Sequence, residues 1–293
     1  MASPTIRIGG YQGEASILTR AVRRLAASLA AVAGAGWQVE VIRDVTERGA
    51  RAADLLTMVE RGEIEICYFA SGYLAGRVAS LGAFDTPFPG VDRASLYAEL
   101  DGALGARLAG DVVRSTGYAP LGFWDNGVRH ISNRLRPLRH PDDCRGLSIR
   151  TLDNARYQKV LAAVGFTPVV LDVKDLVHAV ETHAVDAQEN PLTNTVNFGL
   201  HKTHKHLSLT GHFHGVALLL ANRPWFDALA PEMQRALRTA AADATAAQRQ
   251  WAIDEDALCL ERLKAEGVAI MPAEEIDIAA FRAAVDAATR GQS

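Results

Sequence analysis

Apolar residues recur along the first part of the chain in two alternating periods. A strand-like Thr5–Ile8 is followed by apolar residues at spacings of three and four from Ala15 to Val32, which place one stripe on a helix. A strand is predicted at Trp37–Ile42, then a helix that ends near Gly62, then a strand at Ile64–Phe69. This βαβαβ order predicts a mainly parallel sheet with helices on both faces.

Polar and aromatic side chains follow two of these predicted strands. Tyr11 and Gln12 come after the first strand, and Ser71 and Tyr73 come after the strand at Ile64–Phe69. Ligands of such sheets bind at the carboxyl ends of the strands. We therefore expect these four residues to face a ligand.

A second alternating series begins in the middle of the chain. After a strand-like Tyr118–Trp124, residues 126–168 are rich in arginine and turns. Strands are then predicted at Leu147–Arg150 and Pro168–Leu171, each followed by an amphipathic helix. The series predicts a second α/β domain.

The last part of the chain predicts a very long helix. Strands at Leu207–Thr210 and Val216–Ala221 precede a helical pattern from Pro231 to about Glu266. At 1.5 Å per residue such a helix reaches about 54 Å, which is longer than one small domain, and its alanine-rich stretch lacks the leucines of a coiled coil. A strand at Val268–Met271 and a helix close the chain. We expect one lobe at 1–124 plus about 213–252, and the other at about 125–212 plus 253–293.

The composition excludes several classes of function. The chain has 293 residues and 48% hydrophobic content, and its 31 basic and 34 acidic residues give a net charge of -3, which does not attract nucleic acid. The local arginine run Arg129, Arg134, Arg136 and Arg139 is interpreted as a solvated loop. No apolar run approaches the roughly 18 residues that span a bilayer. Three cysteines, an odd number far apart in the sequence, argue against a disulfide framework or a metal motif.

Arg150 is the main candidate for binding an anion. It ends an apolar strand, where a side chain points to the ligand side of the sheet. The rigid fork of a guanidinium makes two charge-assisted hydrogen bonds to a carboxylate. The alternative is an internal ion pair with Asp153 or Asp172.

A histidine cluster offers a different chemistry. His201, His204, His206, His212 and His214 have spacings that can share a metal, which favours a metal-dependent hydrolase or lyase as the alternative function. No carboxylate lies inside the cluster and no H-E-x-x-H motif is present, so the histidines at 201–206 are expected to be solvated. Neither a G-x-S-x-G elbow nor a catalytic cysteine signature is found.

Five short pieces of sequence together resemble one family, the solute-binding proteins of tripartite ATP-independent periplasmic (TRAP) transporters. The pieces are Phe84–Phe88, Trp124–Arg129, Gly146–Thr151, Gly165 with Pro168, and Val185–Pro191. The resemblance implies a periplasmic-binding-protein fold of type II, with two α/β domains around a hinged cleft and a long helix spanning both lobes. It also implies a binder rather than an enzyme, with no cofactor.

The resemblance also assigns roles to individual residues. It implies that Arg150 holds the carboxylate of an organic acid, that Arg129 is a second arginine at the ligand and that Asn190 contacts the ligand with its amide. Glu189 and Pro191 are implied to be structural members of the same motif.

Departures from the family pattern bear on the ligand. Some sialic-acid binders have charged side chains at the positions of Ala70 and Tyr73 and an aromatic at Val173, and none is kept here. We therefore expect a short or aromatic monocarboxylate, for example a 2-hydroxy or 2-oxo acid. Trp124, Tyr73 and Phe213 are candidates to line its pocket, with core packing as the alternative, favoured for Trp124.

The resemblance implies a location and partners as well. The protein is expected to work in the periplasm and to deliver its ligand to a small and a large permease subunit without spanning the membrane itself. The opening Met1–Pro4 shows no leader, so the leader is expected to have been removed. Docking of the same protein on a receptor kinase, as a sensor, stays open as a further alternative.

Overall fold

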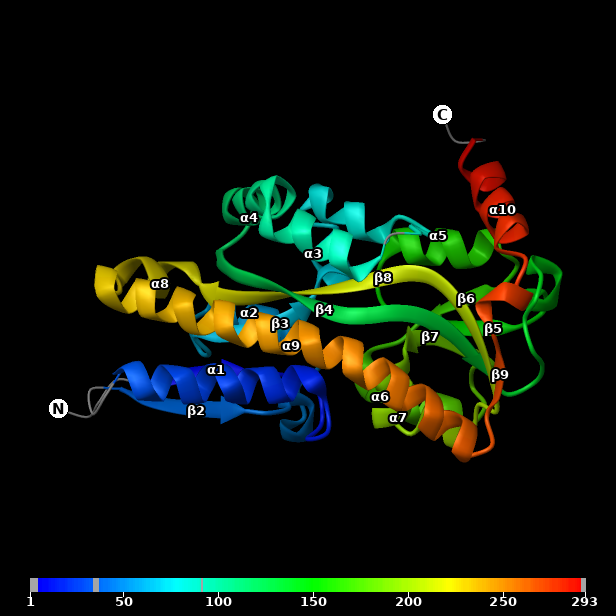
Figure 1. Ribbon diagram of the computed structural model, residues 1–293, viewed down its shortest axis with the longest axis horizontal. Helices are drawn as coiled ribbons and strands as arrows, with labels where there is room; N and C mark the ends of the chain where they lie inside the picture. Colours follow the sequence, from blue (N-terminus) through cyan, green and yellow to red (C-terminus); the bar gives the residue numbers. More distant parts are fainter. Residues whose placement is uncertain (1–4, 34–36, 91, 291–293) are drawn as a thin grey trace. The chain divides into compact units, whose positions relative to one another are not determined.

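The chain divides into two compact units in the computed structural model, which describes residues 5–33, 37–90 and 92–290. The first unit comprises residues 1–81, 91–126 and 216–253, and the second comprises residues 82–90, 127–215 and 254–293. Within the described residues the chain passes between the units inside a 3-10 helix (Ala79–Asp85), inside the strands β4 (Tyr118–Asn133) and β8 (His206–Asn222), and inside the helix α9 (Pro231–Ala265) (Figure 1). The opening residues 1–4 lie outside the described part.

The first unit holds five strands in the order β2-β1-β3-β8-β4. Strand β1 is parallel to β2 and β3, whereas β8 runs antiparallel to β3. The βαβαβ opening predicted from the sequence is therefore confirmed. The strands and helices with described residues in this unit are β1 (Thr5–Gly9), α1 (Ile17–Ala33), β2 (Gln38–Ile42), α2 (Asp54–Glu60), β3 (Ile66–Ala70), α3 (Arg93–Asp101), α4 (Ala103–Ser115), the first part of β4 (Tyr118–Asn133), the last part of β8 (His206–Asn222), α8 (Arg223–Ala228) and the first part of α9 (Pro231–Ala265).

The second unit repeats the alternation of strands and helices. The second part of β4 runs antiparallel to β7, which lies parallel to β5, and β6 lies at the parallel edge beyond β5. The first part of β8 pairs with β9. Besides the parts of β4, β8 and α9 that it shares with the first unit, the described part of this unit holds β5 (Ser148–Thr151), α5 (Ala155–Ala163), β6 (Thr167–Val170), α6 (Val173–Glu181), β7 (Ala187–Pro191), α7 (Leu192–Asn197), β9 (Ala269–Met271) and α10 (Ile278–Arg290).

The middle of the predicted apolar stripe is buried on α1, whereas its two ends, Ala15 and Val32, are exposed. Leu18, Val22, Leu25 and Leu29 are buried while Arg23 is exposed. Full burial of each leucine stabilises the fold by about 1.5–3 kcal/mol. This stripe anchors the helix to the sheet whose strand ends carry the candidate residues.

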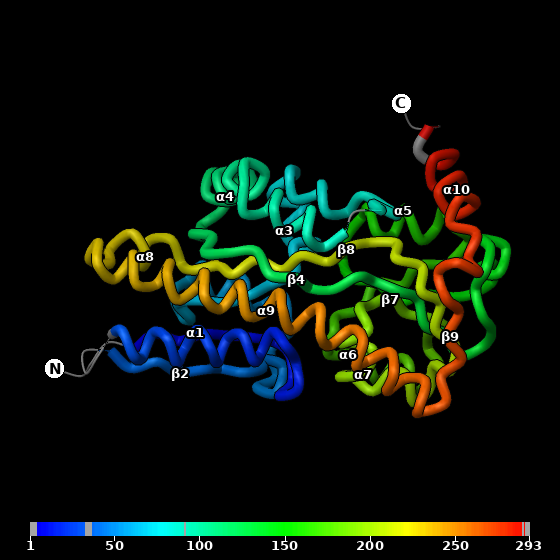
Figure 2. Tube along the Cα trace, viewed as in Figure 1, coloured from blue at the N-terminus to red at the C-terminus, as the bar shows by residue number. Residues whose placement is uncertain are grey.

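Strands β4 and β8 are longer than the sequence pattern predicts. The prediction ended one strand at Trp124 and split the other into Leu207–Thr210 and Val216–Ala221, but each is one uninterrupted strand. Figure 2 shows the path of the chain through β4 and β8. The turn-like Asp125–Arg129 continues β4 because Gly127, at φ 84°, accommodates the bend. A Cβ on Gly127 would also lie only 2.7 Å from Pro191 Cβ of the paired strand β7.

The segment 82–90 belongs to the second unit, although the sequence placed it in the first lobe. Two hydrogen bonds fix it there, from Phe88 N to His212 O (2.8 Å) and from Asn154 Nδ2 to Asp85 Oδ2 (2.9 Å). The Phe88 ring also packs against Phe281 of α10. The segment belongs to the second unit because its contacts lie there. The periodicity of apolar residues does not reveal such contacts.

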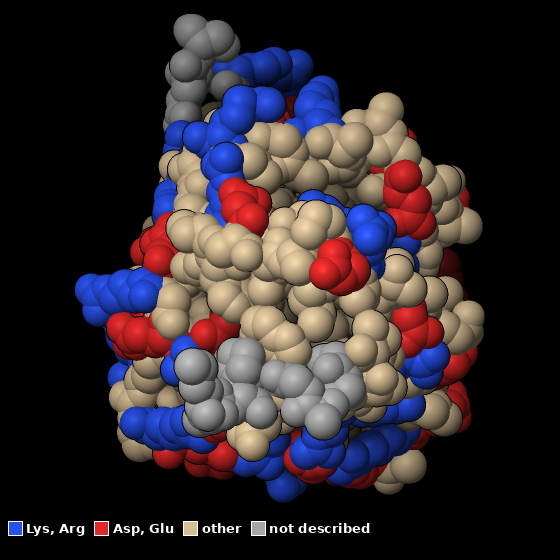
Figure 3. Space-filling model, turned by 90° about the vertical axis from the view of Figure 1, so that its left-hand side faces the viewer, with Lys and Arg blue, Asp and Glu red and all other residues tan. Residues whose placement is uncertain are grey.

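The long helix α9 begins at Pro231, and its 35 residues divide between the units after Ile253. Gly267, at φ 77°, follows its end, as glycine does at many helix C-termini. Figure 3 shows one face of the molecule, where Lys and Arg side chains are interspersed with Asp and Glu. A mixed surface of this kind gives no basic field for a phosphate backbone on that face.

Candidate ligand-binding site

Arg150 is a buried cation that no carboxylate in the described part of the chain neutralises. It lies on β5 with 3% of its surface exposed, and Nε and Nη2 donate to a single carbonyl, Leu171 O, at 3.0 and 2.7 Å. No described residue forms an ion pair with it at the 4.0 Å limit. A buried charge without a counter-ion costs several kcal/mol, so the second unit is poised to accept an anion here.

The internal partners that the sequence offered for Arg150 are not used. The Asp172 carboxylate accepts from Lys174 N (3.1 Å) as the N-cap of α6, because it stands directly before that helix. Asp153 likewise forms no ion pair with the guanidinium among the described residues. The alternative of an internal ion pair was therefore wrong.

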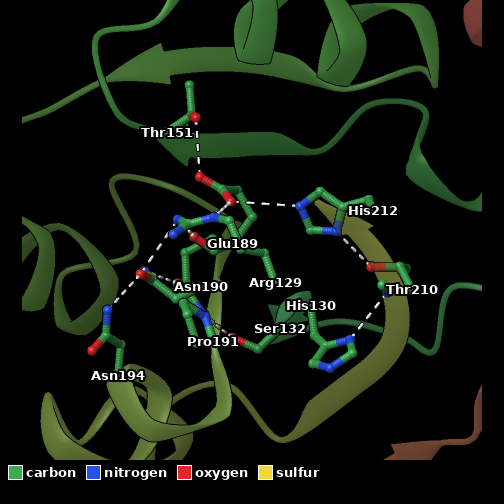
Figure 4. Close-up of polar contacts among 12 residues, drawn as sticks. Arg129, His130, Ser132, Thr151, Glu189, Asn190, Pro191, Asn194, Thr210 and His212 are labelled. Carbon is green, nitrogen blue, oxygen red and sulfur yellow. Dashed lines mark hydrogen bonds and ion pairs between the residues drawn. The ribbon is translucent and has the colours of Figure 1, made fainter. Parts of the chain in front are cut away.

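Arg129, in contrast, is fully engaged inside the second unit. Its Nε donates to the Glu189 carboxylate and its Nη2 to Glu189 O at 2.7 Å (Figure 4). Burial raises the pKa of Glu189, but the charge of Arg129 is the largest opposing effect and the pKa falls to about 2. Arg129 was interpreted as part of a solvated arginine run, and this is wrong because its side chain is buried on β4 between β7 and Tyr157.

Asn190 extends the same network. Its Nδ2 donates to Gln188 Oε1 at 2.6 Å, and its Oδ1 lies 3.4 Å from Arg129 Nη2 and 3.3 Å from Asn194 Nδ2. The side chain of Gln188 in turn donates to Ser132 Oγ (2.7 Å). The structure thus brings Arg129 of β4 together with Glu189 and Asn190 of β7.

Two further predicted residues lie in the second unit. Phe213 is buried in β8 and stacks on Tyr157 of α5, with ring centroids 4.0 Å apart and an angle of 13°. Val173 is half-buried and begins α6, two residues after the carbonyl that holds Arg150. Tyr157 was missed from the sequence because its apolar spacing also fits plain core packing.

The four candidates of the first unit stand where the strand pattern placed them, at the carboxyl ends of β1 and β3. The rings of Tyr11 and Tyr73 both contact Phe69, at 4.8 and 4.9 Å between centroids. The carboxamide of Gln12 accepts from Ser16, and Ser71 is buried at the start of a short 3-10 helix. The aromatic rings of Tyr11 and Tyr73 and the amide of Gln12 therefore lie at the same edge of the first unit's sheet, where β1 and β3 end.

Trp124 is packed as a core residue. None of its surface is exposed, its ring lies 5.8 Å from that of Tyr68, and its Nε1 donates to Thr245 Oγ1 of α9 at 3.0 Å. This is the core packing that the sequence favoured for Trp124 over a role in lining the pocket.

The histidine cluster is spread over separate contacts. His201 Nε2 lies 2.8 Å from Glu266 Oε2, His204 Nδ1 lies 3.1 Å from Ser132 Oγ, and His212 Nδ1 lies 2.7 Å from Thr210 Oγ1. His201 and His204 are only 1% and 0% exposed, so the expectation of solvated histidines was wrong. No group of three or more potential metal ligands occurs in the part of the chain that the structure describes.

Buried His204 makes stability depend on pH. Burial, followed by the charges of Arg134 and His183, lowers its pKa from 6.5 to about 4. Between these values the unfolded chain binds more protons than the folded one, so stability falls as the pH drops from 6.5 towards 4, by up to about 3 kcal/mol. We expect His204→Gln to flatten the melting temperature between pH 6.5 and 4.5, measured by thermal unfolding.

Exposed His178 on α6 supplies the matched control for this effect. His178→Gln is expected to keep the slope of the parent protein. His212, whose pKa burial also lowers, leaves part of the slope in every variant. An unchanged slope in His204→Gln would contradict the assignment to His204.

Comparisons with known proteins identify the family of this chain. The family model "bacterial extracellular solute-binding protein, family 7" matches residues 8–292. The 2,3-diketo-L-gulonate-binding periplasmic protein YiaO of Escherichia coli is 29% identical over 83% of this chain and 73% of its own length. A crystal structure of a TRAP periplasmic solute-binding protein from Polaromonas sp. JS666 bound to D-erythronate matches with a TM-score of 0.91 and 26% identity, over 98% of this chain and 93% of that chain. A second one, from Roseobacter denitrificans with bound β-D-glucuronate, matches with a TM-score of 0.91 and 25% identity over the same shares.

The chain therefore belongs to the bacterial extracellular solute-binding proteins of family 7, the binding proteins of TRAP transporters. The α/β periplasmic-binding-protein fold predicted from the sequence is confirmed. The family binds solutes for transport and does not consist of enzymes, so the hydrolase or lyase alternative is not supported. Among the described residues, no helix combines the length and the apolar character needed to cross a bilayer.

Proposed function

We propose that the protein captures a small organic acid with one carboxylate and that Arg150 is the anchor for that group. The observation that carries the proposal is the buried guanidinium of Arg150, which has only the carbonyl oxygen of Leu171 as an acceptor among the described residues. A carboxylate would give it a bidentate ion pair and remove the cost of an unpaired buried charge.

Arg129 and Asn190 are proposed to orient the ligand rather than to supply net charge. The Glu189 carboxylate already neutralises Arg129, and Asn190 is held by Gln188 and Asn194. A preorganised network of this kind offers hydrogen bonds without the loss of side-chain freedom on binding. One uncompensated arginine matches one carboxylate on the ligand.

We propose the size and the polarity of the acid from three other positions, Ala70, Tyr73 and Val173. Ala70, half-buried Tyr73 and Val173 leave no charged group for a large sugar acid, which favours a short acid such as a 2-hydroxy or 2-oxo acid, or an aromatic acid. Tyr11, Gln12, Ser71, Tyr73 and Phe213 stay proposed ligand contacts. The relatives that bind D-erythronate and 2,3-diketo-L-gulonate take acids with a single carboxylate, in support of this class.

Delivery to a membrane permease made of a small and a large subunit is proposed for this chain from its family membership. Work in the periplasm, after removal of a leader, is proposed on the same basis. Copurification of the two permease subunits with the tagged protein from membranes, dependent on added ligand, would test this part. Capture of a receptor kinase instead would favour the sensor role.

Native mass spectrometry of the purified protein, together with a thermal-shift screen of carboxylic acids, tests the ligand class. We expect a copurifying mass that belongs to a monocarboxylic acid, and stabilisation by about 2.7 kcal/mol when that acid is added at a hundredfold excess over its Kd. A neutral or cationic copurifying molecule, together with no response to any acid, would contradict the proposed function.

A further inference from the structure

A second buried carboxylate, that of Asp85, interacts with the charges of the Arg129–Glu189 pair. One of its two oxygens accepts no hydrogen bond from a described residue. Asp85 is 1% exposed, and its Oδ2 accepts from Asn154 Nδ2 at 2.9 Å. Its Oδ1 is buried and has no hydrogen-bond partner among the residues that the structure describes. Buried polar atoms are nearly always paired, so an orphaned carboxylate oxygen requires an explanation.

The backbone around Asp85 is held in place at a cost. Phe88 adopts φ 49°, a left-handed conformation that a bulky side chain rarely takes. It is fixed by its N–H to His212 O (2.8 Å) and by Arg282 Nη2, which donates to Phe88 O (2.8 Å). Strain that several contacts maintain is common at ligand sites, because it fixes the position of one group.

Asn154 links Asp85 to the connection that carries Arg150. It stands four residues after Arg150, and its Oδ1 caps α5 by accepting from Arg156 N (2.8 Å) and Tyr157 N (3.1 Å). Its amide nitrogen is thereby turned to Asp85. The cap fixes the amide, and the amide fixes one oxygen of Asp85 while leaving the other available.

Asp85 interacts electrostatically with the Arg129–Glu189 pair. Burial raises the pKa of Asp85, whereas the hydrogen bond from Asn154 and the charges of Arg156 and Arg129 oppose this rise. The negative charge of Glu189, the partner of Arg129, raises the pKa of Asp85 further. His212 belongs to the same group, since its buried Nε2 lies 3.5 Å from the Glu189 carboxylate.

We propose that Asp85 is a specificity residue whose Oδ1 accepts a hydrogen bond from a hydroxyl group of the ligand, so that the protein selects hydroxylated monocarboxylates. The inference rests on the proposed binding of an acid by Arg150. A hydroxyl donor satisfies the orphaned oxygen, whereas an alkyl chain leaves it buried and unpaired. A second carboxylate on the ligand would meet the like charge of Asp85 and is disfavoured.

Paired acids that differ only in their hydroxyl groups test this inference. The probes are D-erythronate with butyrate, L-lactate with propionate, and D-gluconate with hexanoate, with succinate as the dicarboxylate. Binding is measured by titration calorimetry to the parent protein, Asp85→Asn, Asp85→Ala and the control Asp186→Asn. Asp186 suits as a control because it is a second-unit carboxylate committed to Ser148 and Arg134. Thermal unfolding of each variant confirms that it is folded.

We expect the parent to prefer at least one hydroxy acid over its deoxy partner by about 10–100-fold, the range of a hydrogen bond to a charged group. In Asp85→Ala this ratio should fall to within about threefold, and Asp85→Asn should in addition bind succinate more tightly than the parent does. Asp186→Asn should keep the parent ratio.

Three results would overturn the inference. They are an unchanged hydroxyl ratio in a folded Asp85→Ala, tighter binding of the deoxy acids by the parent, and preference of the parent for succinate. If none of the acids binds to the parent, or if Arg150→Ala binds them as well as the parent, the proposed function itself fails, and the inference fails with it. The Arg150 variant thus distinguishes the two kinds of failure.

Discussion

Arg150→Ala is expected to abolish the thermal stabilisation that the acid gives to the parent protein. Among the described residues of the parent, this buried guanidinium has only Leu171 O as an acceptor. The ligand carboxylate would therefore be its counter-ion. Truncating one partner of a buried, hydrogen-bonded charge pair costs about 2–5 kcal/mol, which is roughly a 30-fold to several-thousand-fold loss of affinity. Thermal-shift titration with the acid identified by mass spectrometry measures the effect.

Two companion variants sharpen this result. Arg150→Lys keeps the charge but loses the fork, so we expect at most a weakened response. Arg145→Ala removes an arginine of the same unit whose exposed side chain pairs with Asp142, and it should respond as the parent does. A full ligand shift in Arg150→Ala would show that the carboxylate binds elsewhere.

Glu189→Ala is expected to give the largest loss of stability among single substitutions at the site. It leaves the guanidinium of Arg129 buried without its counter-ion and removes the acceptor of Thr151 Oγ1 (3.1 Å). Breaking a buried pair costs about 3–5 kcal/mol, or about 6–20 °C in melting temperature. Thermal unfolding without ligand is the measurement.

A double variant separates the charge effect from the loss of packing. Replacing both partners, as Arg129→Met with Glu189→Leu, removes the unpaired charge and should cost less than Glu189→Ala alone. Glu261→Gln, at an exposed ion pair with Lys264, should change stability by less than about 1 kcal/mol. A double variant less stable than Glu189→Ala would contradict this account of the pair.

The repeated strands and helices were predictable because they depend on local periodicity. Helix α1 buries the middle of the stripe that its spacing predicts, and Tyr11 and Ser71 follow strands that end at the same edge of the sheet because β1 and β3 are parallel neighbours. The segment 82–90 could not be assigned to the second unit from the sequence, because Phe88 N and Asp85 form hydrogen bonds with residues far along the chain. The full lengths of β4 and β8 were also missed, since Gly127 and Gly211 are read locally as turn residues.

The candidate site shows the same division. Arg150 could be singled out by residue type and position, and the family resemblance also pointed to Arg129 and Asn190. The sequence could not show that Arg129 is paired with a carboxylate while Arg150 is not. Glu189 neutralises Arg129 across the paired strands β4 and β7, whereas Asp172 caps a helix instead of pairing with Arg150. The buried environment of His204, which sets its pKa, likewise depends on tertiary packing rather than on the loop sequence.

The central claim is that the protein recognises the carboxylate of its ligand through Arg150. Titration calorimetry of D-erythronate and of the neutral D-erythronamide, each against the parent and Arg150→Ala, tests it most directly. The account predicts that the parent binds the acid at least about 30-fold more tightly than the amide, and that this difference disappears in Arg150→Ala. Equal binding of acid and amide by the parent, or the same preference for the acid in the variant, would contradict it.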